Sequence, residues 1–137
     1  SDRTQDKLMS RGELLSSFIV ARALKQRYQD CIWKDSRELI VTDSNYTAAN
    51  LQIDSTKEQI KHFFHTHSER VVVFPGFIAR SMEGTTTTLG RGGSDFTAAI
   101  IAASVGADLL EIWTDVPGMF TADPRVVPSA RLIVALH

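Results

Sequence analysis

The pattern of apolar and polar positions predicts that the chain opens with a long helix. Between Asp6 and Tyr28, apolar or small residues recur at the spacing of one helix face, which is typical of an amphipathic helix. These positions are Leu8, Gly12, Leu15, Phe18, Ile19 and Ala23. Because a glycine inside a helix costs about 1 kcal/mol relative to alanine, we expect Gly12 to permit a close approach by backbone or ligand.

Short apolar and β-branched runs after this helix predict strands. We expect two strands at Cys31–Lys34 and Leu39–Thr42. A helix should follow from Thr56 to His67, because Ser55–Glu58 has the capping-box pattern. The continuous apolar run Val71–Phe74 is typical of a central strand that is covered on both faces.

The second half of the chain predicts a hairpin, a helix and a further strand. Phe77–Ser81 and Thr85–Leu89 flank a short loop that contains glycine, which indicates a β-hairpin. Phe96–Val105 predicts a helix that ends at Gly106. The side chains of this helix are small or apolar on nearly every face, so we expect it to lie in the interior. Leu109–Thr114 predicts another strand.

Thr85–Asp95 joins the hairpin to the helix and combines four threonines with three glycines. We expect a strand that enters a flexible turn, followed by a helix with Ser94 as its N-cap and Asp95 in its first turn. The amides of Gly92 and Gly93, with those of the first helical turn, would then be free to hold an anion. A tight turn without a ligand is the alternative, and neither the dinucleotide-binding motif nor the P-loop motif applies.

Charged side chains near these elements indicate an amino acid as the ligand. Arg91 has a planar guanidinium suited to a carboxylate or phosphate, and Asp95 offers an acceptor for an ammonium group. Glu13 is a further candidate, although its spacing alone favours a solvated helix charge. Thr114 and Asp115 end a predicted strand, where an open parallel sheet would bind a nucleotide.

Composition and charge indicate a compact globular domain with a small-molecule partner. The 137 residues include 15 lysines and arginines against 16 aspartates and glutamates, so no net field draws the chain to nucleic acid or to an anionic membrane. Its apolar runs are too short to span a bilayer. Cys31, the single cysteine, excludes an internal disulfide, fits a reducing, cytoplasmic compartment and is expected to be a buried structural thiol. The chain opens on Ser1 and not on methionine, so we expect it to begin inside a longer protein.

Three histidines gather in the predicted second helix, but they do not indicate a metal site. His62, His65 and His67 would not share one helix face in the way that ligands four residues apart do. No nearby cysteine or carboxylate completes a ligand set. We therefore assign no metal-binding residues.

Four stretches, in order, resemble aspartokinases of the amino-acid kinase superfamily: Ser10–Glu13, Pro75–Ile78, Thr87–Asp95 and Trp113–Arg125. The resemblance runs through nearly the whole chain. It implies an α/β fold, a three-layer αβα sandwich on a mainly parallel central sheet, which is incomplete in this segment. Residues 1–137 would then be a single partial domain, the central and C-terminal part of the catalytic domain, without an ACT regulatory domain.

The activity that the resemblance implies is ATP-dependent phosphorylation of the side-chain carboxylate of L-aspartate to 4-phospho-L-aspartate, for lysine, threonine and methionine synthesis. A carboxylate is already ionised at neutral pH, so this chemistry needs positioning and charge neutralisation and no general base. Mg²⁺ should accompany ATP and be held mostly by phosphate oxygens, without a dedicated ligand cluster. A homodimer or a higher homo-oligomer is expected.

The same resemblance assigns candidate site residues. The aspartate-binding residues would be Glu13, Arg91 and Asp95, and the phosphate loop would be Gly92, Gly93 and Ser94. The nucleotide-binding residues would be Thr114, Asp115, Phe120, Asp123 and Arg125. Phe120 replaces a tyrosine that is common there, so a hydroxyl hydrogen bond is lost while apolar contact remains. Turn-type hydrogen bonds are the alternative role for Asp115 and Asp123, which precede prolines by two residues and one residue.

Two departures from the family limit the expected activity. The family opens with a K-F-G-G-T-S strand-turn whose lysine meets the transferring phosphoryl group, and neither this lysine nor the later one at the nucleotide site occurs here. No catalytic residue is therefore assigned, and the segment alone should be inactive. The alternatives are a binding module without catalysis, which keeps the aspartate pocket, and another amino-acid kinase such as glutamate 5-kinase or acetylglutamate kinase, which fits the motifs less well.

Overall fold

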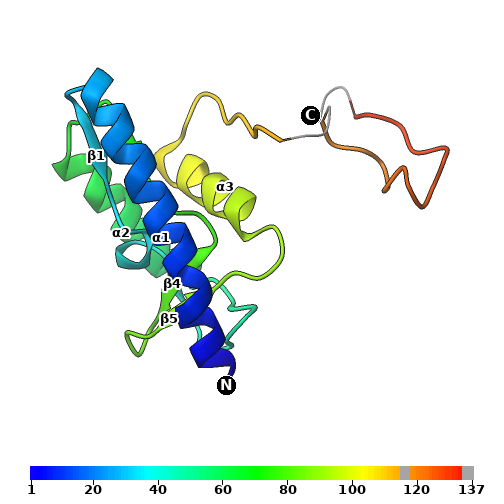
Figure 1. Ribbon diagram of the computed structural model, residues 1–137, viewed down its shortest axis with the longest axis horizontal. Helices are drawn as coiled ribbons and strands as arrows, with labels where there is room; N and C mark the ends of the chain where they lie inside the picture. Colours follow the sequence, from blue (N-terminus) through cyan, green and yellow to red (C-terminus); the bar gives the residue numbers. More distant parts are fainter. Residues whose placement is uncertain (115–117, 134–137) are drawn as a thin grey trace.

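A computed structural model describes residues 1–114 and 118–133 of the chain. It consists of a body, residues 1–106, and an extended arm, residues 107–114 and 118–133, which runs away from the body (Figure 1). In chain order the elements are α1 (Asp2–Arg27), β1 (Cys31–Trp33), the 3₁₀ turn η1 (Ser36–Glu38), β2 (Val41–Thr42), α2 (Ile53–Thr66), β3 (Val71–Val73), β4 (Ile78–Ser81), β5 (Thr86–Thr88) and α3 (Gly93–Val105).

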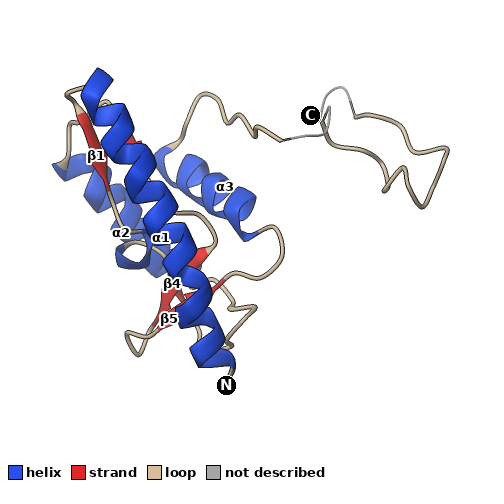
Figure 2. Ribbon diagram, in the orientation of Figure 1, coloured by secondary structure: helices blue, strands red, loops and turns tan. Residues whose placement is uncertain are grey.

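The strands form two small sheets between helices. β1 and β3 pair in parallel, with Cys31 opposite Val71. β2 pairs in parallel with β4, which pairs antiparallel with β5, so the predicted hairpin is confirmed. α1 packs against β1, β3 and β5, whereas α2 packs against β2 and α3 (Figure 2). Helices therefore cover the strands from two sides, and the fold is an incomplete three-layer αβα arrangement.

The apolar core lies between β2, β4 and the pair of helices α2 and α3. Its buried members are Leu39, Ile40, Ile60, Phe63, Ala79 and Ile100. Phe63 meets Phe74 edge to face, with ring centroids 5.9 Å apart. The predicted buried thiol is confirmed, because Cys31 is free and only 1% exposed. Burial of these side chains supplies most of the driving force for folding.

All three predicted helices form, but each begins three or four residues earlier than predicted. α3 ends at Gly106, whose φ of 67° is the left-handed conformation expected of a glycine cap. α1 spans the predicted first helix and begins earlier. α2 begins at Ile53, so Ser55 and Glu58 lie inside its first turns and do not form the capping box. Gln52 occupies the N-cap position without a side-chain hydrogen bond.

The predicted apolar face of α1 points to solvent. Leu8 is 74% exposed, Leu15 62% and Ile19 57%. The buried residues of α1 are Asp6, Ser10 and Ala21. This reversal has a physical cause, because the strand end beneath α1 offers buried threonine groups that polar side chains can bond. No atom lies within 4 Å of a Cβ built at Gly12, so the expected close approach is not formed within the described chain.

Three predictions of deep burial or pairing are also wrong. β3 is half-buried and pairs only with β1 among the described residues, so it is not a central strand. α3 lies at the surface, where Phe96 is 47% exposed. Leu109–Thr114 forms no strand, and Trp113 is 88% exposed. The described chain lacks further neighbours at these places: β3 has a strand on one side only, no described strand pairs with residues 109–114, and part of the surface of α3 is left uncovered.

None of the helices that the structure describes combines the length and the apolar character needed to cross a bilayer.

Candidate functional site

The glycine loop, residues 89–92, connects β5 to α3 at the edge of the body. Gly90 and Gly92 have φ angles of 73° and 74°, in the left-handed region that glycine adopts without strain. Gly92 is the N-cap of α3 and Gly93 its first residue. The prediction that Ser94 caps this helix is wrong, because the helix starts before Ser94 and places that residue in its first turn.

Close packing beneath the loop explains two of the glycines. A Cβ on Gly93 would lie 2.9 Å from Cδ2 of Phe77 and 3.0 Å from Cβ of Leu89. A Cβ on Gly76 would lie 3.0 Å from Cα of Ser94. Gly92 has open space around it, so its backbone is accessible to a ligand. The side of the loop that faces the body is therefore closely packed, and the side at Gly92 is open. This open side lies at the N-terminus of α3, the positive end of the helix.

Phe77 is strained and supports the loop, and sequence reasoning missed it. Its φ of 71° is unusual for a bulky residue. Its amide donates to Oγ1 of Thr97 at 3.1 Å, and its carbonyl accepts from the amide of Leu89 at 2.9 Å. Thr97 in turn donates to the carbonyl of Gly93 at 2.8 Å. No sequence pattern predicts a left-handed backbone at Phe77. The only sequence signal concerns the bond from Thr97 to the carbonyl of Gly93, because a threonine hydroxyl in a helix can donate to the carbonyl four residues before it.

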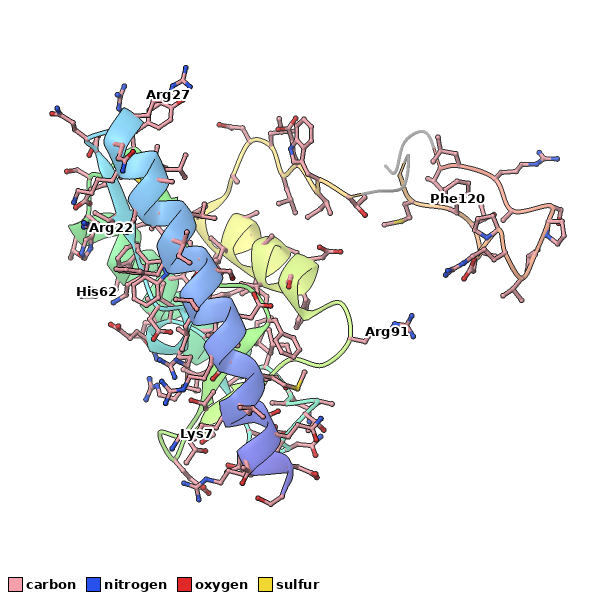
Figure 3. The ribbon with its side chains drawn as sticks, viewed as in Figure 1. Lys7, Arg22, Arg27, His62, Arg91 and Phe120 are labelled. Carbon is pink, nitrogen blue, oxygen red and sulfur yellow. The ribbon has the colours of Figure 1, made fainter. Side chains whose placement is uncertain are left out.

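Arg91 and Asp95 flank the open side of the loop, and both are exposed. Figure 3 shows that the side chain of Arg91 points away from the body. Within residues 1–114 and 118–133, its guanidinium forms no hydrogen bond or ion pair. A planar fork of donors is therefore available for a carboxylate or phosphate, and Asp95 provides a negative charge one turn away.

Glu13 lies on the side of α1 that faces the strands. It follows Asp6 by seven residues, or two helical turns, so the two carboxylates share one face about 10 Å apart along the axis. Glu13 is half-buried, unlike the solvated charge that its sequence context favours. No hydrogen bond or ion pair among the described residues joins Glu13 to Arg91 or Asp95.

The predicted nucleotide residues lie on the arm, except Asp115, which falls outside the described residues. Phe120 forms an isolated bridge with Leu132, so residues around it double back as a narrow hairpin. Oδ1 of Asp123 accepts from the amide of Arg125 at 2.9 Å, and their side chains form an ion pair at 3.0 Å. The turn-type hydrogen bond expected as one role for Asp123 is thus confirmed.

Electrostatics links the arm to the glycine loop. The pKa of the Asp123 carboxyl is lowered, first by the hydrogen bonds from Arg125 and further by the positive charge of Arg91. Arg91 therefore lies within electrostatic range of Asp123, and Figure 3 shows it on the side of the body from which the arm extends toward Phe120.

A groove of about 530 Å³ runs between β3 and α3. Gly76, Ser94 and Thr97 line it next to the glycine loop, and Glu69 and Arg70 are its charged lining residues. Because Gly76 follows the carboxyl end of a parallel strand, this groove lies where ligands bind in open α/β sheets. No group of three or more metal-ligating side chains occurs in the described part of the chain.

The structure defines a layered α/β protein with a glycine loop at a helix N-terminus, an arrangement found in proteins that bind anionic ligands. Residues 2–136 match the amino acid kinase family, and the chain belongs to this family. Lysine-sensitive aspartokinase 3 of Escherichia coli (strain K12) is 40% identical over 129 residues, which cover 93% of this chain and 29% of that protein. The Helicobacter pylori aspartokinase is 37% identical over 135 residues, 98% of this chain and 33% of that protein.

A solved structure agrees with this assignment. The crystal structure of E. coli aspartokinase III in complex with aspartate and ADP matches with a TM-score of 0.82 at 38% identity, over 97% of this chain and 30% of that one. The chain therefore spans about a third of the length of these three proteins. The resemblance to the amino-acid kinase superfamily is confirmed.

Proposed function

We propose that this chain is the central part of the catalytic domain of an aspartokinase. The whole protein would transfer the terminal phosphoryl group of ATP to the side-chain carboxylate of L-aspartate, giving 4-phospho-L-aspartate. The observation that carries the proposal is the open glycine loop with Arg91, whose guanidinium has no hydrogen bond or ion pair to the described residues. This loop lies in a chain that aligns with aspartokinases over more than nine-tenths of its length. Another amino-acid kinase, such as glutamate 5-kinase, is the alternative.

Aspartate binding would use the charged groups around the loop. The guanidinium of Arg91 suits a bidentate contact to a carboxylate, while Asp95 and Glu13 supply negative charge for the ammonium group. The reacting carboxylate is ionised at neutral pH, so these residues orient the substrate and need not remove a proton. Their contribution is to hold the nucleophile in line with the phosphoryl group.

The loop and the arm also fit a nucleotide. Gly92, which is left-handed and has open space at the N-terminus of α3, fits a phosphate oxygen. Thr114, Phe120, Asp123 and Arg125 would contact the rest of ATP from the arm, together with Asp115. Mg²⁺, when bound, neutralises charge on the phosphates, and phosphate oxygens would be its main ligands because the described residues contain no ligand cluster.

Assembly and location are further parts of the proposal. β3 pairs only with β1 among the described strands and leaves an edge open, which supports pairing with other parts of the protein or with a second copy. We propose a homodimer or a higher homo-oligomer that works in the cytoplasm. The free thiol of Cys31 suits a reducing compartment, and the net charge of −1 gives no basis for binding nucleic acid or a membrane.

The test of the proposal is Arg91→Ala in the whole protein, measured by coupled ADP release. The KM for aspartate should rise about 100-fold, because a charge-assisted bidentate contact is lost, while the KM for ATP changes far less. Arg27→Ala is the matched control, since Arg27 is an exposed arginine in the last turn of α1, far from Arg91 in Figure 3. An equal rise in both KM values would contradict the assignment of Arg91 to aspartate.

A further inference from the structure

Asp6 is a buried carboxylate that accepts hydrogen bonds at both of its oxygens. Its side chain is 0% exposed, although it lies in the second turn of α1. Oδ2 accepts from the amides of Thr47 at 2.9 Å and Thr88 at 3.1 Å. Oδ1 accepts from the hydroxyl of Thr88 at 2.7 Å and from the Thr47 amide at 3.1 Å. A buried carboxylate is tolerated because donors surround it in this way.

Both partners of Asp6 border the glycine loop. Thr88 is the last residue of β5, directly before the loop. Thr47 lies against the loop from the other side, since its carbonyl oxygen would be 3.3 Å from a Cβ on Gly90. Thr47 has a φ of 69°, which is unfavourable for a β-branched residue. The two hydrogen bonds from its amide to Asp6 therefore help to hold a conformation that the residue would not adopt alone.

We infer that Asp6 is a positioning residue that fixes the glycine loop relative to α1. Its hydrogen bonds hold Thr88 at the end of β5 and Thr47, which lies beside Gly90. In this way Asp6 determines the position of Arg91, the residue after Gly90. Because Asp6 and Glu13 share one face of α1, the same hydrogen bonds also set the distance between Glu13 and the loop. This inference rests on the proposed function, in which Glu13 and Arg91 hold the same aspartate molecule.

Three variants of the whole protein separate this role from simple stability. Asp6→Asn keeps the shape but turns an amide donor toward the donors of Thr47 and Thr88. Thr88→Val removes only the hydroxyl donated to Asp6, and Thr88→Ser restores it, so the test survives if Asp6→Asn fails to fold. Asp35→Asn is the matched control, because Asp35 is another largely buried carboxylate, 8% exposed, that accepts bonds from Arg37.

Two measurements give distinct outcomes. Hydrogen exchange of the amides in residues 88–93 should be faster in Asp6→Asn than in Asp35→Asn, and the KM for aspartate should rise about tenfold at an unchanged KM for ATP. Thr88→Val should give a smaller rise and Thr88→Ser almost none. Faster exchange with an unchanged KM for aspartate would uphold the positioning role and overturn the proposed role of the loop in aspartate binding. Exchange in residues 88–93 no faster than in Asp35→Asn would overturn the inference.

Discussion

The glycine loop and the arm carry comparably distinctive sequence motifs but differ in how much structure they form. The amide of Leu89, in the loop, donates to the carbonyl of Phe77, and Thr88, which precedes the loop, donates two hydrogen bonds to Asp6. The arm is exposed, and its described hydrogen bonds join only nearby residues, such as Thr121 to Arg131. The loop motif is therefore fixed by tertiary contacts with the body, whereas the arm motif has only local contacts among the described residues.

The two proposed ligands, aspartate and the nucleotide, are assigned to these two different regions. The groups assigned to aspartate are on or beside the body, whereas those assigned to the nucleotide lie on the arm. In this proposal the loop would hold an anion by itself, since the contacts that fix its backbone lie within residues 76–97. The proposed phosphoryl transfer would further require the nucleotide residues to be brought against the loop, together with the two lysines that the resemblance implies and whose motifs do not occur in residues 1–137.

The largest expected effect separates binding from turnover in the chain alone. Residues 1–137 should bind aspartate weakly, because the loop is formed, yet turn over more than about 100-fold slower than the whole protein, since loss of one well-placed donor costs ~10²–10³ in rate. Calorimetric titration with aspartate and a coupled ADP-release assay measure the two quantities. Turnover within about tenfold of the whole protein would show that the missing lysines do not carry the chemistry.

The packing beneath the loop predicts the next largest effect. Gly93→Ala places a Cβ 2.9 Å from Cδ2 of Phe77, so neighbouring atoms must shift to make room for it. This displacement should lower the free energy of unfolding by about 2 kcal/mol. Gly12→Ala is the control, because open space surrounds that helical glycine, and it should raise the free energy of unfolding by about 0.5–1 kcal/mol. Urea unfolding measures both, and a Gly93→Ala variant as stable as the parent would contradict the rigid packing of the loop.

Limited proteolysis sharpens the comparison between the two regions. Trypsin should cut after Arg131 and in the arm generally before it cuts in α1, where Arg22 and Arg27 lie within a helix. The first large product, identified by mass spectrometry, should therefore retain the whole body. Early cleavage within α1 or the glycine loop, with the arm intact, would reverse the order of rigidity that the structure shows.

Sequence reasoning succeeded where the determinants are local. The β4–β5 hairpin, the helix after the glycine loop and its end at Gly106 follow from turn residues and periodicity within a few positions. It failed for the exposed face of α1, because the polar partners that bury Asp6 lie 41 and 82 residues away in sequence. The helical spacing of apolar residues therefore did not identify the buried face of α1.

Long-range partners also explain the other errors. Leu109–Thr114 has the composition of a strand, but a strand needs a neighbour to share its hydrogen bonds, and the described chain provides none there. The left-handed backbones of Thr47 and Phe77 are likewise imposed by tertiary hydrogen bonds, and no sequence pattern announces them. The candidate residues on the loop were found because their motif is contiguous, whereas the residues that position the loop were not.

The smallest expected effect tests whether the loop and the arm communicate electrostatically. The pKa of Asp123 is lowered from its ordinary value of 3.8, so the ionised carboxylate stabilises the turn with Arg125. This stabilisation is complete at a pH above 3.8 and is lost as the pH falls through the lowered pKa. In an NMR titration of the carboxyl carbon, Arg125→Gln should raise this pKa most, and Arg91→Gln should raise it slightly. Asp43, whose pKa is lowered by hydrogen bonds from Asn50, is an internal control that neither variant should move. If Arg91→Gln left the Asp123 titration unchanged, the charge of the loop would not reach the arm, and the two regions would act independently until a ligand joins them.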